Sequence, residues 1–152
     1  MEKEILKSIQ AELNGDGNSL AKLLNTLSLV KEALGEGSWV GLYVYDEKSN
    51  SLNLGPFQGS PACEVIKPAK GVVGSCYTSK RALYVKDVSK FPGYISCDSK
   101  VKSEAVWPLM YDEQVIAVLD IDSPKLDGLK DELPILDQLA VLLGDYNPAG
   151  GN

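Results

Sequence analysis

A lone cysteine followed by several carboxylates is the part of this chain best suited to chemistry. Cys97 stands in residues 95–104 (ISCDSKVKSE), and after a short strand residues 118–124 read VLDIDSP. Side chains at positions i and i+2 of a strand point the same way, so Asp120 and Asp122 are predicted to share one face. Buried carboxylates cost several kcal/mol unless they are paired or hydrogen-bonded. The pattern therefore favours a site that binds something polar.

A second interpretation of VLDIDSP stays open at this point. The segment could be a strand that ends in a turn, in which Asp122 starts an Asx-type turn and only Asp120 is half buried. The first interpretation predicts a functional site, whereas the second predicts a local structural role.

The chain contains no histidine, which excludes several classes of enzyme. Cys-His proteases and Ser-His-Asp hydrolases need an imidazole that titrates near neutral pH. The three cysteines, Cys63, Cys76 and Cys97, form no CxxC pair, so the usual Cys/His zinc spacings are missing as well. We therefore expect no metal centre and no cofactor, and any catalytic acid or base must be a carboxylate, Lys, Tyr or Cys.

The charge pattern argues against two kinds of partner. Acidic residues outnumber basic ones by 21 to 15, and the basic residues are scattered instead of forming a stripe. Nucleic acid and anionic membranes are therefore poor partners. Apolar runs fall far below the roughly 18 residues of a membrane span, and the segment MEKEILKSIQ has no signal-peptide core. We expect a cytoplasmic protein, in which cysteines stay reduced unless chemistry uses them.

The periodicity of apolar residues predicts an α+β fold. A chain of 152 residues is long enough for one domain with its own core. Helical spacing predicts two opening helices, the second ending near Gly35, a short helix around 75–80 and a closing helix over 133–143. Strands are predicted at 39–45, 51–55, 62–66, 81–85, 104–110 and 114–121.

The long segment 87–103 lies between two predicted strands and is rich in Ser, Lys, Gly and Pro. Loops of this length in a compact domain are usually functional or disordered. The order of elements predicts an antiparallel β-sheet flanked by helices, with Cys97 on a long loop beside it.

Several motifs, taken in order and at their spacing, resemble a known family. They are GSWVGLYVYDEKSNSLNLGPFQGSPAC, KGVVG, FPGYISCDSKVKSE, WPL and VLDIDSP. Together they are similar to the free methionine-(R)-sulfoxide reductases, which are built on the GAF fold. The resemblance implies a single GAF domain over residues 1–152, with a core of about 19–144. We expect the tail 147–152 to be disordered.

The resemblance implies a thiol-dependent reduction of free L-methionine (R)-sulfoxide. The cysteine of the CDS motif, here Cys97, would attack the sulfoxide sulfur and become a sulfenic acid. Glu104, Asp120 and Asp122 match the family's acids, so one would protonate the sulfoxide oxygen and the others would hold the substrate's ammonium group. Cys63 matches the resolving cysteine, which implies a Cys63–Cys97 disulfide that thioredoxin would reduce.

Two further substrate contacts are expected, the first from the resemblance and the second because the motifs contain no arginine. Trp39 would pack against the methyl-sulfur end of the substrate, whereas Tyr43, on the same strand face, is interpreted as a core aromatic. Backbone amides of the long loop would receive the substrate carboxylate, namely those around Tyr94, Ile95, Ser96 and Cys97.

The chain departs from the family pattern at one cysteine. Many members carry a third cysteine in GVCG, where this sequence has Val73, and its own Cys76 lies three positions further on. A relay through a middle cysteine is therefore in question, and we expect Cys76 to be structural.

An alternative function belongs to a different class. GAF domains also serve as small-molecule sensors, so the chain could be a binding or redox-sensing module without catalytic turnover. The sequence does not fix the oligomeric state, and a homodimer stays open.

Overall fold

The computed structural model describes residues 1–146, so the expected disordered tail 147–152 lies outside the described residues. The helices are α1 (Glu4–Leu13), α2 (Ser19–Leu34), α3 (Gly71–Ser79) and α4 (Leu133–Tyr146), with short 3-10 helices η1 (Val88–Lys90) and η2 (Lys130–Glu132). The strands are β1 (Trp39–Asp46), β2 (Ser51–Gln58), β3 (Val65–Ile66), β4 (Leu83–Val85), β5 (Ser103–Tyr111) and β6 (Gln114–Ser123).

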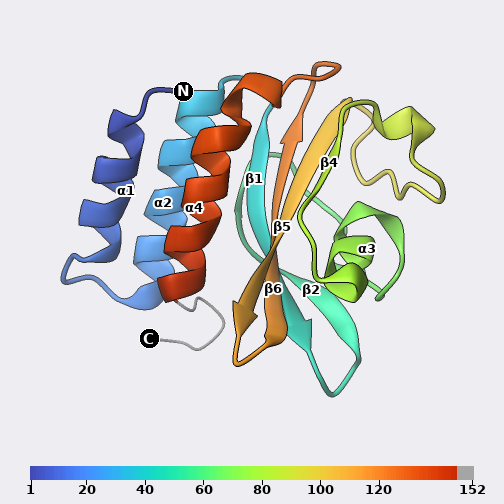
Figure 1. Ribbon diagram of the computed structural model, residues 1–152, viewed down its shortest axis with the longest axis horizontal. Helices are drawn as coiled ribbons and strands as arrows, with labels where there is room; N and C mark the ends of the chain where they lie inside the picture. The colour runs from blue at the N-terminus through green and yellow to red at the C-terminus, as the bar shows by residue number, and fades with distance from the viewer. Residues whose placement is uncertain (147–152) are drawn as a thin grey trace.

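The six strands form one antiparallel sheet in the order β3-β2-β1-β6-β5-β4. Helices α1, α2 and α4 lie side by side on one face of this sheet, and α3 lies on the other (Figure 1). The predicted α+β fold is therefore confirmed, with β1 and β6 paired at the centre although they are far apart in the chain.

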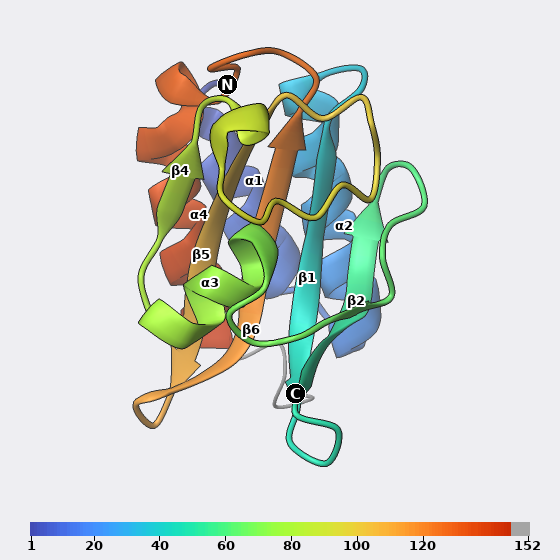
Figure 2. The ribbon, with the colours of Figure 1, turned by 90° about the vertical axis from the view of Figure 1, so that its right-hand side faces the viewer.

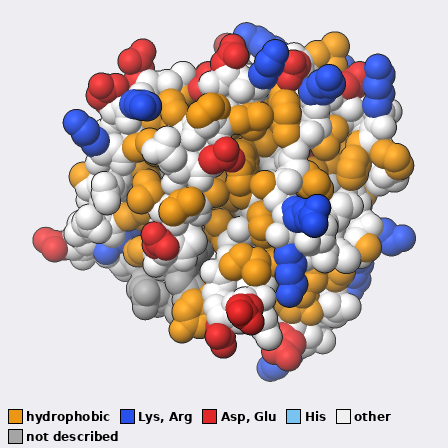
Figure 3. Space-filling view, in the orientation of Figure 1, with side chains coloured by type: hydrophobic (Ala, Val, Ile, Leu, Met, Phe, Trp, Pro, Cys, Tyr) orange, Lys and Arg blue, Asp and Glu red, His pale blue; other side chains and the backbone are white. Residues whose placement is uncertain are grey.

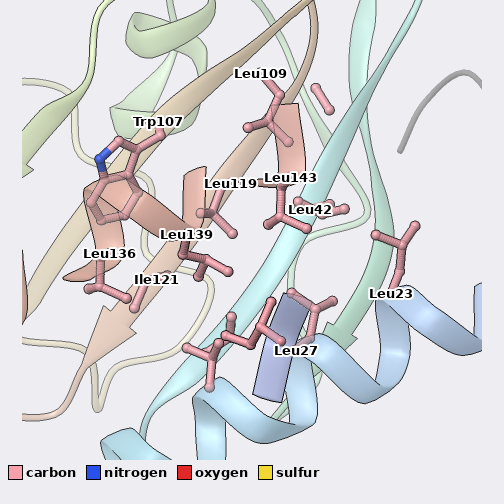
Figure 4. Packing of buried hydrophobic residues seen from close by; sticks show 14 of the residues in the cluster. Leu23, Leu27, Leu42, Trp107, Leu109, Leu119, Ile121, Leu136, Leu139 and Leu143 are labelled. Carbon is pink, nitrogen blue, oxygen red and sulfur yellow. The ribbon is translucent and has the colours of Figure 1, made fainter. Parts of the chain in front are cut away.

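Successive side chains of the central strands point to opposite faces of the sheet, so the core is divided into two clusters. Leu42, Trp107 and Leu119 face α2 and α4 and pack against leucines of those helices (Figure 4). Tyr43, Val106 and Val118, each displaced by one residue from these, belong to the cluster on the opposite face, beneath α3. Helix α1, which precedes the expected core of 19–144, adds Ile9 and Leu13 to the first cluster.

Polar contacts fix the ends and edges of the helical layer. The side chain of Asn18 accepts a hydrogen bond from the Ala21 N–H at 2.9 Å and so caps α2. The buried indole of Trp107 donates to Asp137 of α4 at 2.7 Å, which ties α4 to β5.

Acidic and basic side chains are scattered over the face seen in Figure 3. Within residues 1–146, every helix is too short or too polar to cross a membrane.

Helix α3 differs from its predicted range because it starts earlier. The sequence predicts a helix only around 75–80, since the stretch 68–74, which contains Pro68 and two glycines, looks like a break. In the structure Gly71 adopts φ +62°, a conformation that glycine reaches at little cost, and the helix begins there. The predicted strand 62–66 is shortened to Val65–Ile66. Residues before it leave the sheet toward the long loop.

The loop between β4 and β5 crosses the sheet beside α3 (Figure 2). Its two ends are held together by a hydrogen bond from Val88 N–H to the Lys102 carbonyl at 2.9 Å. Lys102 N–H in turn donates to the carbonyl of Ser123 at the end of β6, also at 2.9 Å. The loop that contains Cys97 is thus anchored next to the end of the strand that carries the two aspartates.

Candidate active site

Three carboxylates meet on the face of the sheet that α3 covers. Glu104 of β5 pairs with Asp122 of β6 in the strand ladder, and Asp120 lies two residues before Asp122 on the same face. Oxygen atoms of the three side chains lie within 4.8 Å of one another. The prediction of inward aspartates on one strand face is confirmed. The turn interpretation of Asp122 is wrong, because β6 continues through Ser123.

Burial and mutual repulsion disfavour the charged forms of these acids. Burial, followed by repulsion from Asp122, raises the pKa of Glu104 from 4.5 to about 8. Burial and its neighbour Glu104 raise the pKa of Asp120, and burial and Asp120 raise that of Asp122. The cluster therefore retains protons near neutral pH, and a retained proton can be donated to a bound molecule.

The same oxygens also form a donor set of the kind that hard cations prefer. Repulsion among three close carboxylates can be relieved in two ways, by a bound cation or by protonation. The group consists of carboxylate oxygens and contains neither the nitrogen nor the sulfur ligands of zinc sites.

Cys63 and Cys97 are joined by a disulfide, the pairing that the resemblance implies. Their Cα atoms are 5.4 Å apart although 34 residues separate them in the chain. The Tyr43 hydroxyl donates a hydrogen bond to the Cys63 carbonyl at 2.8 Å, which fixes the backbone on one side of the bond. A disulfide therefore lies at the edge of the cavity that the three carboxylates line.

The third cysteine has a different environment. Cys76 is fully buried in α3, and burial, followed by repulsion from Asp120, raises its pKa to about 12. A thiol in such surroundings is a poor nucleophile because little thiolate forms. This environment agrees with the expected structural role of Cys76.

Two aromatic side chains form a wall beside the acids. Trp39 and Tyr43 share a strand face, with ring centroids 6.2 Å apart, and Phe57 stacks on Trp39 at 5.4 Å. The Trp39 indole N–H donates to the Ser60 carbonyl at 2.8 Å. Tyr43 is a buried core aromatic as expected, but it also lines the cavity and holds the Cys63 backbone. Sequence reasoning missed this second role because the contact spans 20 residues.

A cavity of about 50 Å³ brings most of the predicted site residues together. Those that line it are Trp39, Tyr94, Ile95, Cys97, Glu104, Asp120 and Asp122. Cys63 and Ser96 are not among the described residues of its wall. The Tyr94 N–H is already bonded to the Phe91 carbonyl at 3.1 Å, so it is not available as the expected carboxylate donor.

The cavity wall also contains a segment that sequence reasoning did not single out. Lys70 and the first turn of α3 line it. The motif KGVVG was part of the resemblance, but nothing in its residue types indicates that it faces the acids. Only the packing of α3 over the sheet brings it there.

The geometry agrees with what comparison with known proteins finds. The family model for the GAF domain matches residues 21–145. GAF domain-containing protein A of Dictyostelium discoideum is 42% identical over 126 residues, which span 83% of this chain and 78% of that protein. Free methionine-R-sulfoxide reductase of Escherichia coli is 37% identical over 129 residues, which span 85% of this chain and 77% of that protein.

A solved structure is similar over nearly the whole chain. It is the X-ray structure of free methionine-R-sulfoxide reductase from Neisseria meningitidis in complex with its substrate, at 36% sequence identity. The TM-score is 0.88, and the match covers 97% of this chain and 88% of that one.

Proposed function

The chain belongs to the free methionine-R-sulfoxide reductases, a family of GAF-domain oxidoreductases, and we propose that it reduces free L-methionine (R)-sulfoxide to L-methionine. The supporting observation is a Cys63–Cys97 disulfide at the edge of a cavity that three close carboxylates line. Reduction of a sulfoxide by a thiol needs a nucleophilic sulfur and a proton donor beside it. This site supplies both.

In the first step, the reduced Cys97 attacks the sulfoxide sulfur as a thiolate. The sulfoxide oxygen is protonated and moves to the Cys97 sulfur, which becomes a sulfenic acid, while methionine departs. The substrate sulfur gains two electrons and the Cys97 sulfur loses two. The cavity position of Cys97 supports its role as the attacking residue.

The proton for the departing oxygen comes from the carboxylate cluster. A Glu104 pKa of about 8 means that this acid can hold a proton at neutral pH, and Asp120 and Asp122 are shifted in the same direction. One acid protonates the oxygen, and the others bind the substrate's ammonium group. The Trp39 ring packs against the methyl-sulfur end of the substrate.

The catalytic cycle closes through Cys63. Its thiol attacks the Cys97 sulfenic acid, the disulfide forms and water leaves. A dithiol reductant, which we take to be thioredoxin in the cytoplasm, then transfers two electrons by thiol–disulfide exchange and restores both thiols.

One assay tests the proposal directly. The protein is incubated with dithiothreitol and either methionine sulfoxide diastereomer, and the methionine released is quantified. We expect the free (R) form to be consumed and the (S) form to be left. We also expect no reduction of N-acetyl methionine (R)-sulfoxide amide, because it lacks the charged groups that the pocket would bind. Equal turnover of this blocked compound would contradict free amino-acid recognition, and no turnover of either free diastereomer would contradict the function.

A further inference from the structure

The disulfide is the part of the site that is open to the surface. Cys97 is exposed and Cys63 is half-buried, whereas Asp120 is buried. The two cysteines belong to the Cys63 segment (61–70) and the Cys97 segment (90–102), which both run in front of the sheet in Figure 2, on the side of α3. A protein thiol that reduces a disulfide must bring its own sulfur to one of the two sulfurs, so it needs this access.

Exposed aliphatic side chains flank the disulfide on both sides. Val65, two residues after Cys63, is 56% exposed, and Ile95, two residues before Cys97, is 37% exposed. A shallow groove lies between β2 and the Cys63 segment, and its apolar lining consists of Leu54, Phe57, Pro61, Ala62 and Val65. Apolar residues that are exposed around a reactive bond are typical of the centre of a protein–protein contact.

The same two segments are basic, although the protein as a whole is acidic. They contain two acidic residues and five exposed lysines, Lys67, Lys70, Lys90, Lys100 and Lys102. The net charge of the whole chain is −6. Positive charge gathered around the disulfide attracts a partner with a negative surface and raises the rate of encounter with it.

We propose that the Cys63 segment and the Cys97 segment together form the docking surface for a dithiol protein of net negative charge, with Val65 and Ile95 in the apolar contact. This inference rests on the proposed function, whose cycle needs a dithiol reductant. It names the surface that such a reductant binds and the sulfur that it attacks.

The attacked sulfur is that of Cys97, because Cys97 is the more exposed of the two cysteines. The partner's thiolate forms a bond to this sulfur, the disulfide breaks, and Cys63 leaves as a thiolate that takes up a proton. The partner's second thiol then loses its proton and attacks the partner's own sulfur in the mixed disulfide. The partner ends as a disulfide, and Cys97 is released as a thiol with both electrons transferred.

The first test measures the second-order rate constant at which a thioredoxin of net negative charge reduces the oxidised protein, with dithiothreitol as the small-molecule comparison. Val65→Asp should slow thioredoxin about tenfold, because it places a repelling charge in the apolar contact, and should leave the rate with dithiothreitol nearly unchanged. Val141→Asp is the matched control, since Val141 is also an exposed valine, at 62%, but lies on α4 on the opposite face of the sheet.

The second test changes charge. Lys100→Glu should slow thioredoxin about three- to tenfold at low ionic strength, and the difference should largely vanish at about 1 M salt because the interaction is screened. Lys7→Glu makes the same change in net charge at an exposed lysine of α1 and should stay within about twofold of the unaltered protein.

Equal rates with thioredoxin in each variant and its control, or an equal slowing with dithiothreitol, would overturn the docking surface. A lower molecular mass of Val65→Asp in light scattering, with an unchanged thioredoxin rate, would also overturn it, because the surface would then join two copies of the chain. No reduction of the unaltered protein by thioredoxin would overturn the class of partner.

The third test locates the attack. A thioredoxin variant without its second cysteine is mixed with the oxidised protein, the reaction is stopped early with acid, and the peptide that carries the thioredoxin is identified by mass spectrometry. The peptide should contain Cys97, and recovery on the Cys63 peptide would overturn the order of attack. All three tests start from the disulfide and use no sulfoxide, so their outcome is independent of the methionine-release assay that tests the function.

Discussion

The two faces of the sheet are made by the same strands but have opposite chemistry. On the face covered by α1, α2 and α4, Leu119 is fully buried among aliphatic side chains. The next residue of β6, Asp120, is also buried, but it lies on the other face, among carboxylates and beside a disulfide. Each fully buried aliphatic side chain contributes about 1.5–3 kcal/mol, whereas buried charges oppose folding. The helix-covered face only stabilises the fold, whereas the α3 face combines an apolar cluster with the unfavourable groups that chemistry needs.

The largest expected effect comes from the cysteine at the edge of the site face. Cys97→Ser should abolish even a single turnover, because the substitution removes the attacking sulfur. Cys63→Ser should still release about one methionine per protein and then stop with thioredoxin. Methionine release under single- and multiple-turnover conditions measures both. Cys76→Ala is the control and should recycle normally. If recycling stopped in Cys76→Ala but continued in Cys63→Ser, the resolving thiol would be misassigned.

The acids should show the next largest effect on rate, without loss of the fold. Glu104→Gln, Asp120→Asn and Asp122→Asn each remove a proton source, so kcat/KM should fall roughly 10²- to 10⁴-fold. With less negative charge nearby, the thiolate of reduced Cys97 should form more readily and react faster with iodoacetamide. Sulfoxide reduction and alkylation rates are measured on the same samples. Undiminished reduction in all three variants would remove the acids from the mechanism.

A substitution on the helix-covered face should instead lower stability and leave activity nearly unchanged. Leu119→Ala leaves a cavity among the helices and should lower the free energy of unfolding by about 2–5 kcal/mol. The activity of the protein that remains folded should stay within about twofold of the original. Urea unfolding of the reduced protein and kcat/KM per folded molecule are the two measurements. A loss of activity as large as that of Asp120→Asn would show that the two faces are not independent.

A pH dependence of stability should come from the site face alone. The folded protein holds a proton on Glu104 up to about pH 8, whereas an ordinary glutamate loses it near pH 4.5. The folded state therefore binds more protons in this range, and the free energy of unfolding should fall as pH rises from about 4.5 to 8. Urea unfolding at several pH values should show a shallower slope for Glu104→Gln. Leu119→Ala should lower the whole curve without changing its slope, and an identical slope in Glu104→Gln would contradict the assignment.

Regular features of the fold were predictable because they depend on local patterns. Alternation in VLDIDSP is enough to predict that Asp120 and Asp122 share a face, since strand geometry alone determines it. The Cys63–Cys97 pairing came from resemblance, since a separation of 34 residues says nothing about distance in space. The contributions of Lys70 and of the Tyr43 hydroxyl were not predictable. They arise where α3 and the Cys63 segment fold back over the sheet, and the glycine that starts α3 looks like a helix breaker in the sequence.

Because of the disulfide, the rate at which a protease cleaves the protein should also depend on its redox state. It ties the segment after β2 to the middle of the β4–β5 loop, which carries the exposed lysines Lys90, Lys100 and Lys102. Trypsin cleaves after lysine where the backbone can open locally, and a crosslink in such a loop restricts that opening. Reduction releases the crosslink, so the loop should be cut faster in the reduced protein than in the oxidised one. The pattern of tryptic fragments then reports how much of the protein has completed its oxidative half-cycle, without any thiol reagent.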